Sequence, residues 1–224
     1  MYTPVPAQRI IPALIPADEQ SLRENLRSLR FAHEIQIDVV DGQFVDYHSW
    51  PYEPAGAVQS IVSDIASHTI EVDLMVADPL AAAETWLAAG AQMLVFHVES
   101  VSFSDLERFL AGCDGVSVGI SALNDTPEEV LYAYAPLADY IQVMGIAQIG
   151  AQGAPFDERV LGRVARLQHD LPHLSISIDG SVNETTLPRL VSAGIDRFVV
   201  GSALLTAPDR EERFEQLESL VRAQ

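Results

Sequence analysis

With 224 residues and 48% hydrophobic content, the chain is long enough and apolar enough to form one large globular domain. The net charge of −19 argues against nucleic acid or an anionic membrane as a partner, because both attract a basic surface. All 13 basic residues are arginine, which excludes lysine-dependent catalysis such as Schiff-base aldol cleavage. An acidic chain without lysine fits adaptation to high salt and biased base composition equally well.

The cysteine content and the N-terminus indicate the compartment. The single cysteine, Cys113, rules out an intrachain disulfide and fits a reducing cytosol, where it would serve as a small buried apolar residue. Residues 1–9 lack a basic segment followed by an apolar one, and no run of 18 apolar residues occurs. We therefore expect a cytoplasmic protein without a signal peptide and without a membrane span.

Strand patterns and helix patterns alternate along the whole chain. The strands are expected at residues 9–14, 34–40, 70–75, 93–97, 116–120, 140–144, 175–178 and 197–200. Amphipathic helices are expected at residues 19–31, 55–67, 79–89, 104–113, 127–134, 157–169, 185–193 and 210–222.

Eight strand–helix units predict an α/β fold, a single (β/α)8 or TIM barrel over residues 1–224. An open, doubly wound sheet is the alternative, but it usually has fewer strands. The first predicted strand is also not followed by the glycine-rich motif of dinucleotide-binding sheets.

Three aspartates, Asp38, Asp73 and Asp179, lie near the ends of predicted strands. Side chains alternate between the two faces of a strand, so Gln36 shares a face with Asp38, and inward-facing aspartates would converge inside one barrel. Barrel enzymes carry their chemistry at these strand ends. A cluster of carboxylates needs a counter-charge, and in a chain without lysine the expected one is a metal ion or bound protons.

Glycine–serine pairs follow the last two strands and predict a phosphate site. Gly180 with Ser181 and Gly201 with Ser202 lie where barrels commonly bind phosphate through backbone N–H groups. Gly150 and Gly153, after the sixth strand, are expected to close a third side of this site.

Short motifs in the order of the strands resemble the ribulose-phosphate 3-epimerase family along nearly the whole chain. The segment 36–42 is similar to the family's His-x-Asp-x-Met-Asp-Gly, and the segment 73–76 is similar to its His-Leu-Met-Val. The segments 96–99, 119–127, 179–180 and 201–203 match its Phe-His-x-Glu, its fifth strand and turn, its Asp-Gly and its Gly-Ser-Ala.

The resemblance implies a barrel of the ribulose-phosphate-binding type that epimerises a small ketose phosphate. Asp38 and Asp179 match the two acids that exchange the proton next to the ketone. The family's metal ligands, two histidines and two aspartates, fall on Gln36, Asp38, Asp73 and Asp179, so both histidines are replaced. This all-oxygen set suits Mg²⁺ or Mn²⁺ better than zinc or iron, unless no metal is bound.

Supporting residues and assembly complete the expectation. Met75 and Met144 match family methionines, while His97 faces inward by its strand phase and is expected to support a metal ligand through a hydrogen bond. The family also suggests a homo-oligomer. We expect neither nucleic acid nor a membrane as a partner.

Two other functions stay open. The loss of both histidines fits a relative that binds a sugar phosphate, or assembles, without turnover. The segment 73–78 also resembles the Asp-x-Lys-x-x-Asp of sugar-phosphate decarboxylases and aldolases, but Met75 stands where their lysine belongs.

Overall fold

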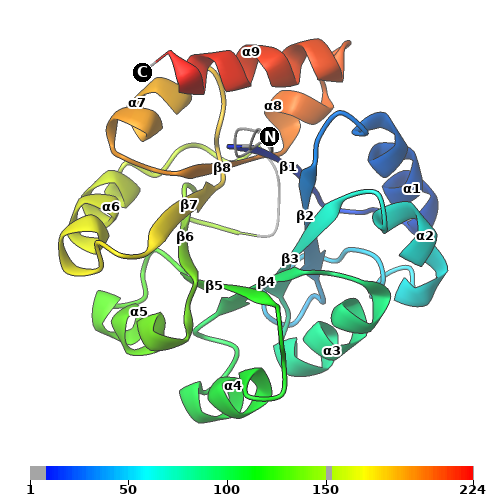
Figure 1. Ribbon diagram of the computed structural model, residues 1–224, viewed down its shortest axis with the longest axis horizontal. Helices are drawn as coiled ribbons and strands as arrows, with labels where there is room; N and C mark the ends of the chain where they lie inside the picture. The colour runs from blue at the N-terminus through cyan, green and yellow to red at the C-terminus, as the bar shows by residue number, and fades with distance from the viewer. Residues whose placement is uncertain (1–8, 150–152, 224) are drawn as a thin grey trace, which may run out of the picture.

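The computed structural model describes residues 9–149 and 153–223, and its strands form one closed parallel barrel in sequence order. β8 pairs with β1 through the register Ile11↔Val199, which closes the sheet. The predicted (β/α)8 barrel is confirmed (Figure 1). The strands are β1 (Ile10–Leu14), β2 (Glu34–Val40), β3 (Thr69–Met75), β4 (Met93–His97), β5 (Ser117–Ala122), β6 (Tyr140–Met144), β7 (Ser175–Asp179) and β8 (Arg197–Val200).

Helices surround the barrel as an outer ring (Figure 1). They are α1 (Glu19–Ser28), η1 (Val58–Ile61), α2 (Val62–Ile65), α3 (Pro79–Ala89), α4 (Phe103–Leu110), α5 (Glu128–Tyr134), η2 (Ala135–Leu137), α6 (Arg159–Asp170), α7 (Leu187–Ser192), α8 (Ser202–Leu205) and α9 (Arg210–Arg222). Within residues 9–149 and 153–223, none of these helices has the length and apolarity to cross a membrane.

Local signals explain where several helices begin and end. Asp18 caps α1, because its carboxylate accepts the backbone N–H of Ser21 at 2.7 Å while the Ser21 hydroxyl accepts that of Asp18. Pro79 opens α3, where its missing N–H costs nothing, and Gly90 ends that helix with a φ of 109°. These bounds match the prediction for α3.

The helix expected over residues 55–67 is wrong in length. Only η1 and α2 form there, and the N-cap residue Ala57 is extended and makes no capping bond from its side chain. The indole of the buried Trp50 lies where a Cβ of Gly56 would be, so this part of the segment packs on a tryptophan. The short α8, directly after β8, was not predicted.

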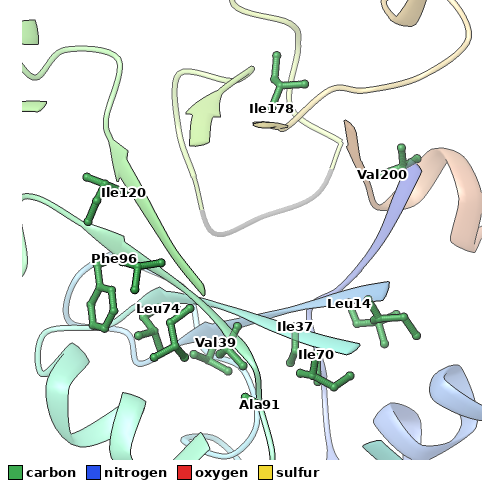
Figure 2. Close-up of a cluster of buried hydrophobic side chains, with 14 of the residues drawn as sticks. Leu14, Ile37, Val39, Ile70, Leu74, Ala91, Phe96, Ile120, Ile178 and Val200 are labelled. Atoms are coloured by element: carbon green, nitrogen blue, oxygen red, sulfur yellow. The ribbon is translucent and has the colours of Figure 1, made fainter. Parts of the chain in front are cut away.

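The apolar core lies between the barrel and its helices. Ile37 and Val39 alternate with the inward side chains of Gln36 and Asp38 along β2, and both are fully buried in the core. Leu74, Phe96, Ile120, Ile178 and Val200 extend the same cluster around the barrel (Figure 2). Helix α9 seals the closure, because Glu218 accepts the backbone N–H groups of Arg9 and Ile10 at 3.0 and 2.9 Å.

The inside of the barrel is polar even at the level where the strands begin. Arg197 of β8 forms ion pairs with Glu34 of β2 and, at 2.9 Å, with Glu71 of β3. Tyr140 donates its hydroxyl proton to Glu71, and its ring lies 4.6 Å from the guanidinium carbon. Gly119 leaves room for this ring, because a Cβ there would lie 2.5 Å from it. One partly buried cation, Arg197, thus compensates the acids at this level.

Candidate active site

Three carboxylates meet inside the barrel at the ends of their strands. Asp38 and Asp73 are register partners on β2 and β3, and Asp179 ends β7. One carboxylate oxygen from each lies within 4.8 Å of the others. Asp73 is fully buried, Asp38 is 4% exposed, and Asp179 is partly exposed, so the cluster opens to solvent on the side of Asp179. The structure therefore brings together the aspartates that strand phase singled out.

Amide and imidazole groups bind these carboxylates. Gln36 donates from Nε2 to Asp38 Oδ1 at 2.7 Å and to Asp179 Oδ2 at 3.1 Å, so one amide bridges the two acids. Asp73 Oδ1 lies 2.9 Å from His97 Nε2, and its Oδ2 accepts a bond of 2.9 Å from Gln142. Both oxygens of Asp73 are thus engaged by side chains of β4 and β6.

Burial and crowding raise the pKa of both bridged acids. Burial, and then the negative charges of Asp179 and Asp73, raise the pKa of Asp38 well above its ordinary value. Burial, and then the charge of Asp73, raise the pKa of Asp179 to about 7. At neutral pH such a pair can offer one protonated and one ionised carboxyl group, which are an acid and a base side by side.

For His97, which contacts Asp73, burial and the neighbouring charge have opposite effects on the pKa. Burial lowers the pKa of its imidazole, but the adjacent Asp73 carboxylate outweighs this, so the pKa is raised. Phe44 packs 5.4 Å from the imidazole ring, and Phe44 and Val45 also contact the buried cluster of Val40, Met75 and Met144. Phe44 thus gives the imidazole of His97 an apolar neighbour.

The raised pKa of Asp179 predicts how the free energy of unfolding depends on pH. Because its pKa rises from 3.8 unfolded to about 7 folded, the native chain holds the proton between these values and loses this advantage as pH increases. After chelator treatment, stability relative to Asp179→Asn should fall by a few kcal/mol, in order of magnitude, between about pH 4 and 7. Urea unfolding of both proteins across this range measures the difference, and parallel profiles would contradict a raised pKa.

A cavity of about 180 Å³ opens beside Asp38 and Asp179. Gly153, Gly180, Ser181, Gly201 and Ser202 line it opposite the apolar side chains of Met75 and Met144. The residues predicted to bind phosphate therefore line the same cavity as Asp38 and Asp179. Gly150 lies outside the described residues. None of the described arginines lines the cavity, so an anion there would depend on neutral donors.

A sequence profile of the ribulose-phosphate 3-epimerase family matches residues 9–205. The chain belongs to this family. A ribulose-phosphate 3-epimerase from Treponema pallidum is 32% identical over 208 residues, which cover 88% of this chain and 91% of that protein. One from Eremothecium gossypii is 28% identical over 199 residues, covering 85% and 82% of the two chains.

Solved structures share the fold at lower identity. One described as KGPDC from Streptococcus mutans has a TM-score of 0.67 and 13% identity, with 96% of this chain and 97% of that chain covered. A 3-hexulose-6-phosphate synthase has a TM-score of 0.69 and 15% identity, with 95% and 99% covered. At such identities these neighbours show the barrel alone.

The carboxylate cluster of this family member could hold a metal ion, although both family histidines are replaced. Its three aspartates offer hard oxygen ligands at a mutual spacing that one cation can bridge. Gln36 Oε1 is buried without a hydrogen-bond partner, and turning this amide by 180° would add a fourth oxygen. Asp73 has both oxygens in hydrogen bonds already, so its share in a metal site would be the weakest.

Several residues around the site were missed from the sequence. Gln142 is fully buried and donates to Asp73, and Asn183 lines the cavity beside Ser181. The inward phase of β6 was the available signal for Gln142. Asp41 also lies near a strand end, but it accepts the backbone N–H groups of residues 43, 44 and 77 and so fixes the neighbouring loops.

Proposed function

We propose that this protein epimerises a ketose phosphate of the ribulose-phosphate type by proton transfer through Asp38 and Asp179. The observation that carries the proposal is the pair itself. Two carboxyl groups with raised pKa values, one buried and one partly exposed, share one bridging amide and line the same cavity. Membership of the epimerase family supports this reaction over others.

In the proposed mechanism the ionised carboxylate removes the proton from the carbon next to the ketone. An enediolate forms, and the protonated carboxyl group returns a proton to the opposite face of that carbon. Gln36 holds both acids in place through its two hydrogen bonds. Phe44 and Val45 keep water from quenching the carbanion-like intermediate.

A divalent ion would be held by the side chains of Gln36, Asp38, Asp73 and Asp179. Because all of these donors are oxygen atoms, Mg²⁺ or Mn²⁺ is favoured over zinc or iron. Such an ion would supply positive charge for the enediolate oxygen. His97 and Gln142 would hold the Asp73 carboxylate in its orientation for such an ion.

The phosphate of the substrate would bind to the loops after β7 and β8. Ser181 is the informative residue there, because it adopts a φ of +56° and is the one non-glycine residue at positive φ in the described ranges. A side chain in this conformation costs about 1 kcal/mol. The presence of a hydroxyl at such a position, on the cavity wall, supports a role in donating to the phosphate.

We predict opposite effects of Ser181→Gly on stability and binding. Relief of the backbone strain should stabilise the fold by about 0.5 kcal/mol, net of the entropy of glycine in the unfolded chain. Loss of the hydroxyl should weaken inorganic phosphate binding roughly tenfold. Scanning calorimetry measures the stability of the wild type and of Ser181→Gly, and titration calorimetry measures their affinity for inorganic phosphate. Ser181→Ala is the control, because it should lose affinity without gaining stability. Equal affinity in all three proteins would remove Ser181 from the phosphate site.

Solvent exchange tests the activity. Ribulose phosphate incubated in D₂O with the enzyme and Mg²⁺ or Mn²⁺ should gain deuterium at the carbon that epimerises, and chelator should stop the gain. If no ketose phosphate exchanges with any divalent ion present, the protein does not catalyse this reaction.

A non-catalytic sugar-phosphate-binding protein is the second candidate. The observation that favours it is the replacement of both histidine ligands, together with the engagement of both Asp73 oxygens by other side chains. Such a protein would bind the ketose phosphate without deuterium exchange. A decarboxylase or aldolase is disfavoured, because Met75 lines the cavity where a lysine would be needed.

Compartment, oligomeric state and ligand can also be proposed. We propose a cytoplasmic homo-oligomer with a small sugar phosphate as its ligand. Family membership and the acidic charge support these proposals.

A further inference from the structure

The turn after β5, residues 122–126, is fixed from two sides by charged side chains. Glu99, which follows β4, accepts the backbone N–H of Leu123 at 2.9 Å and the hydroxyl proton of Thr126. Arg163 of α6 donates to the carbonyl of Leu123 at 3.0 Å and to that of Thr126. The turn therefore has a fixed position relative to both elements.

That turn presents Asn124 to the end of β6. Its amide nitrogen lies 2.9 Å from the carbonyl oxygen of Met144, 3.1 Å from that of Ile146 and 3.0 Å from Oδ2 of Asp157. The two carbonyl groups flank Gly145 in the chain. One side chain thus fixes the backbone on both sides of this glycine.

Gly145 in turn contacts the backbone of the second proposed acid. Its N–H donates to the carbonyl of Asp179 at 2.6 Å, and its own carbonyl accepts the N–H of Asp157 at 2.8 Å. A Cβ on Gly145 would lie 2.1 Å from the carbonyl oxygen of Gly180, so β6 and β7 meet there as closely as only glycine allows. β5, β6 and β7 are neighbours in the barrel (Figure 1).

We propose that Asn124 is a positioning residue that sets the backbone of Asp179 through Gly145. Its bonds to the two flanking carbonyls orient the Gly145 N–H toward Asp179, and the pinned turn holds Asn124 in place. The proposal rests on the function proposed above for Asp179. Its effect on turnover follows from the steep dependence of proton transfer on geometry, since a shift of about 1 Å can cost about a hundredfold.

Asn124→Ala tests the proposal. Asn124 does not line the cavity, so kcat should fall roughly tenfold to a hundredfold while KM changes by less than about threefold. Hydrogen exchange of the Gly145 amide, followed by NMR, should accelerate in the same variant. Asp125→Ala is the matched control, because this neighbour in the turn is exposed and, among the residues that the structure describes, its carboxylate pairs only with Arg159. It should leave both measurements unchanged.

A second variant keeps the test sharp if the first one folds poorly. Combining Asn124→Asp with Asp157→Asn preserves an amide–carboxylate pair and the net charge, but it removes the donor to both carbonyls. We expect the kcat loss and the fast Gly145 exchange to persist, with a lower Tm because Asp157→Asn also removes the ion pair with Arg159. Normal kcat and a protected Gly145 amide in either variant would overturn the proposal.

The two proposals fail differently. If the wild-type protein shows no turnover, the epimerase function is wrong, and the exchange rate of the Gly145 amide still decides whether Asn124 holds this backbone.

Discussion

Asp38→Asn and Asp179→Asn are each expected to slow epimerisation by about 10²- to 10⁴-fold, the range that a general acid or base contributes. Asparagine keeps the shape and the hydrogen bond to Gln36 but can neither take up nor release a proton at the reacting carbon. Because the two acids act in one sequence of steps, the double variant should be little worse than either single variant.

Deuterium exchange makes this prediction more specific. If each acid serves one face of the carbon, the acid that remains can still remove the proton of one epimer. Asp38→Asn and Asp179→Asn should therefore exchange opposite epimers with solvent while interconverting neither at an appreciable rate. Mass spectrometry of each isolated epimer after incubation in D₂O measures this pattern.

Asp73→Asn is the informative control for these variants. Asp73 belongs to the carboxylate cluster but does not line the cavity, so Asp73→Asn should leave both acids able to exchange protons while the loss of its charge lowers their raised pKa values. It should raise the concentration of Mg²⁺ or Mn²⁺ needed for activity, because one proposed oxygen ligand is lost. Exchange of the same epimer by both acid variants would contradict the assignment of one acid to each face of the carbon.

Strand phase was the part of the site that the sequence could predict. The period of two along β2, β3 and β7 places Gln36, Asp38, Asp73 and Asp179 inside any closed barrel, whatever the details of its loops. Eight regular strand–helix units made that closed barrel the expected fold. Contacts that follow from these two regularities were therefore accessible before the structure.

Contacts between side chains on distant strands were not accessible in the same way. The bridge from Gln36 to Asp179 joins residues 143 positions apart, and its geometry depends on the size of the barrel. The three bonds of Asn124 depend on the conformation of a turn and on the absence of a Cβ at Gly145. The short η1–α2 segment likewise reflects the packing of Trp50, which helix periodicity does not report.

The carboxylates inside the barrel occur at two levels along its axis. The two levels differ in the groups that offset the negative charge of the carboxylates. Near the strand starts, Glu34 and Glu71 face Arg197, with Tyr140 donating to Glu71. Near the strand ends, the described neighbours of the aspartates are amides and one imidazole. The first level is therefore a self-contained ion-pair network, whereas the second retains the raised pKa values and the metal-binding capacity on which catalysis would depend.

Arg197→Met should destabilise the fold by about 3–5 kcal/mol, the usual cost of leaving a buried charge without its partner. Glu71 is fully buried, and burial already raises its pKa against the opposing effects of Arg197 and Tyr140. Without the guanidinium this pKa should rise further, so the native variant would bind a proton that the unfolded chain releases. The loss should therefore be largest at neutral pH and shrink as the pH falls toward 5.

Urea unfolding of a double-mutant cycle measures the effect. Glu34→Gln should cost about 1 kcal/mol or less, because Glu34 is partly solvated and Arg197 keeps its bond to Glu71. Adding Glu71→Gln to Arg197→Met should recover most of the lost stability, because the uncompensated charge is then absent. If Arg197→Met costs no more than Glu34→Gln, then Glu71 is already neutral in the wild-type barrel. The level near the strand starts would then be stabilised by the Tyr140 hydrogen bond and by packing. The proposed difference in charge between the two levels would be wrong.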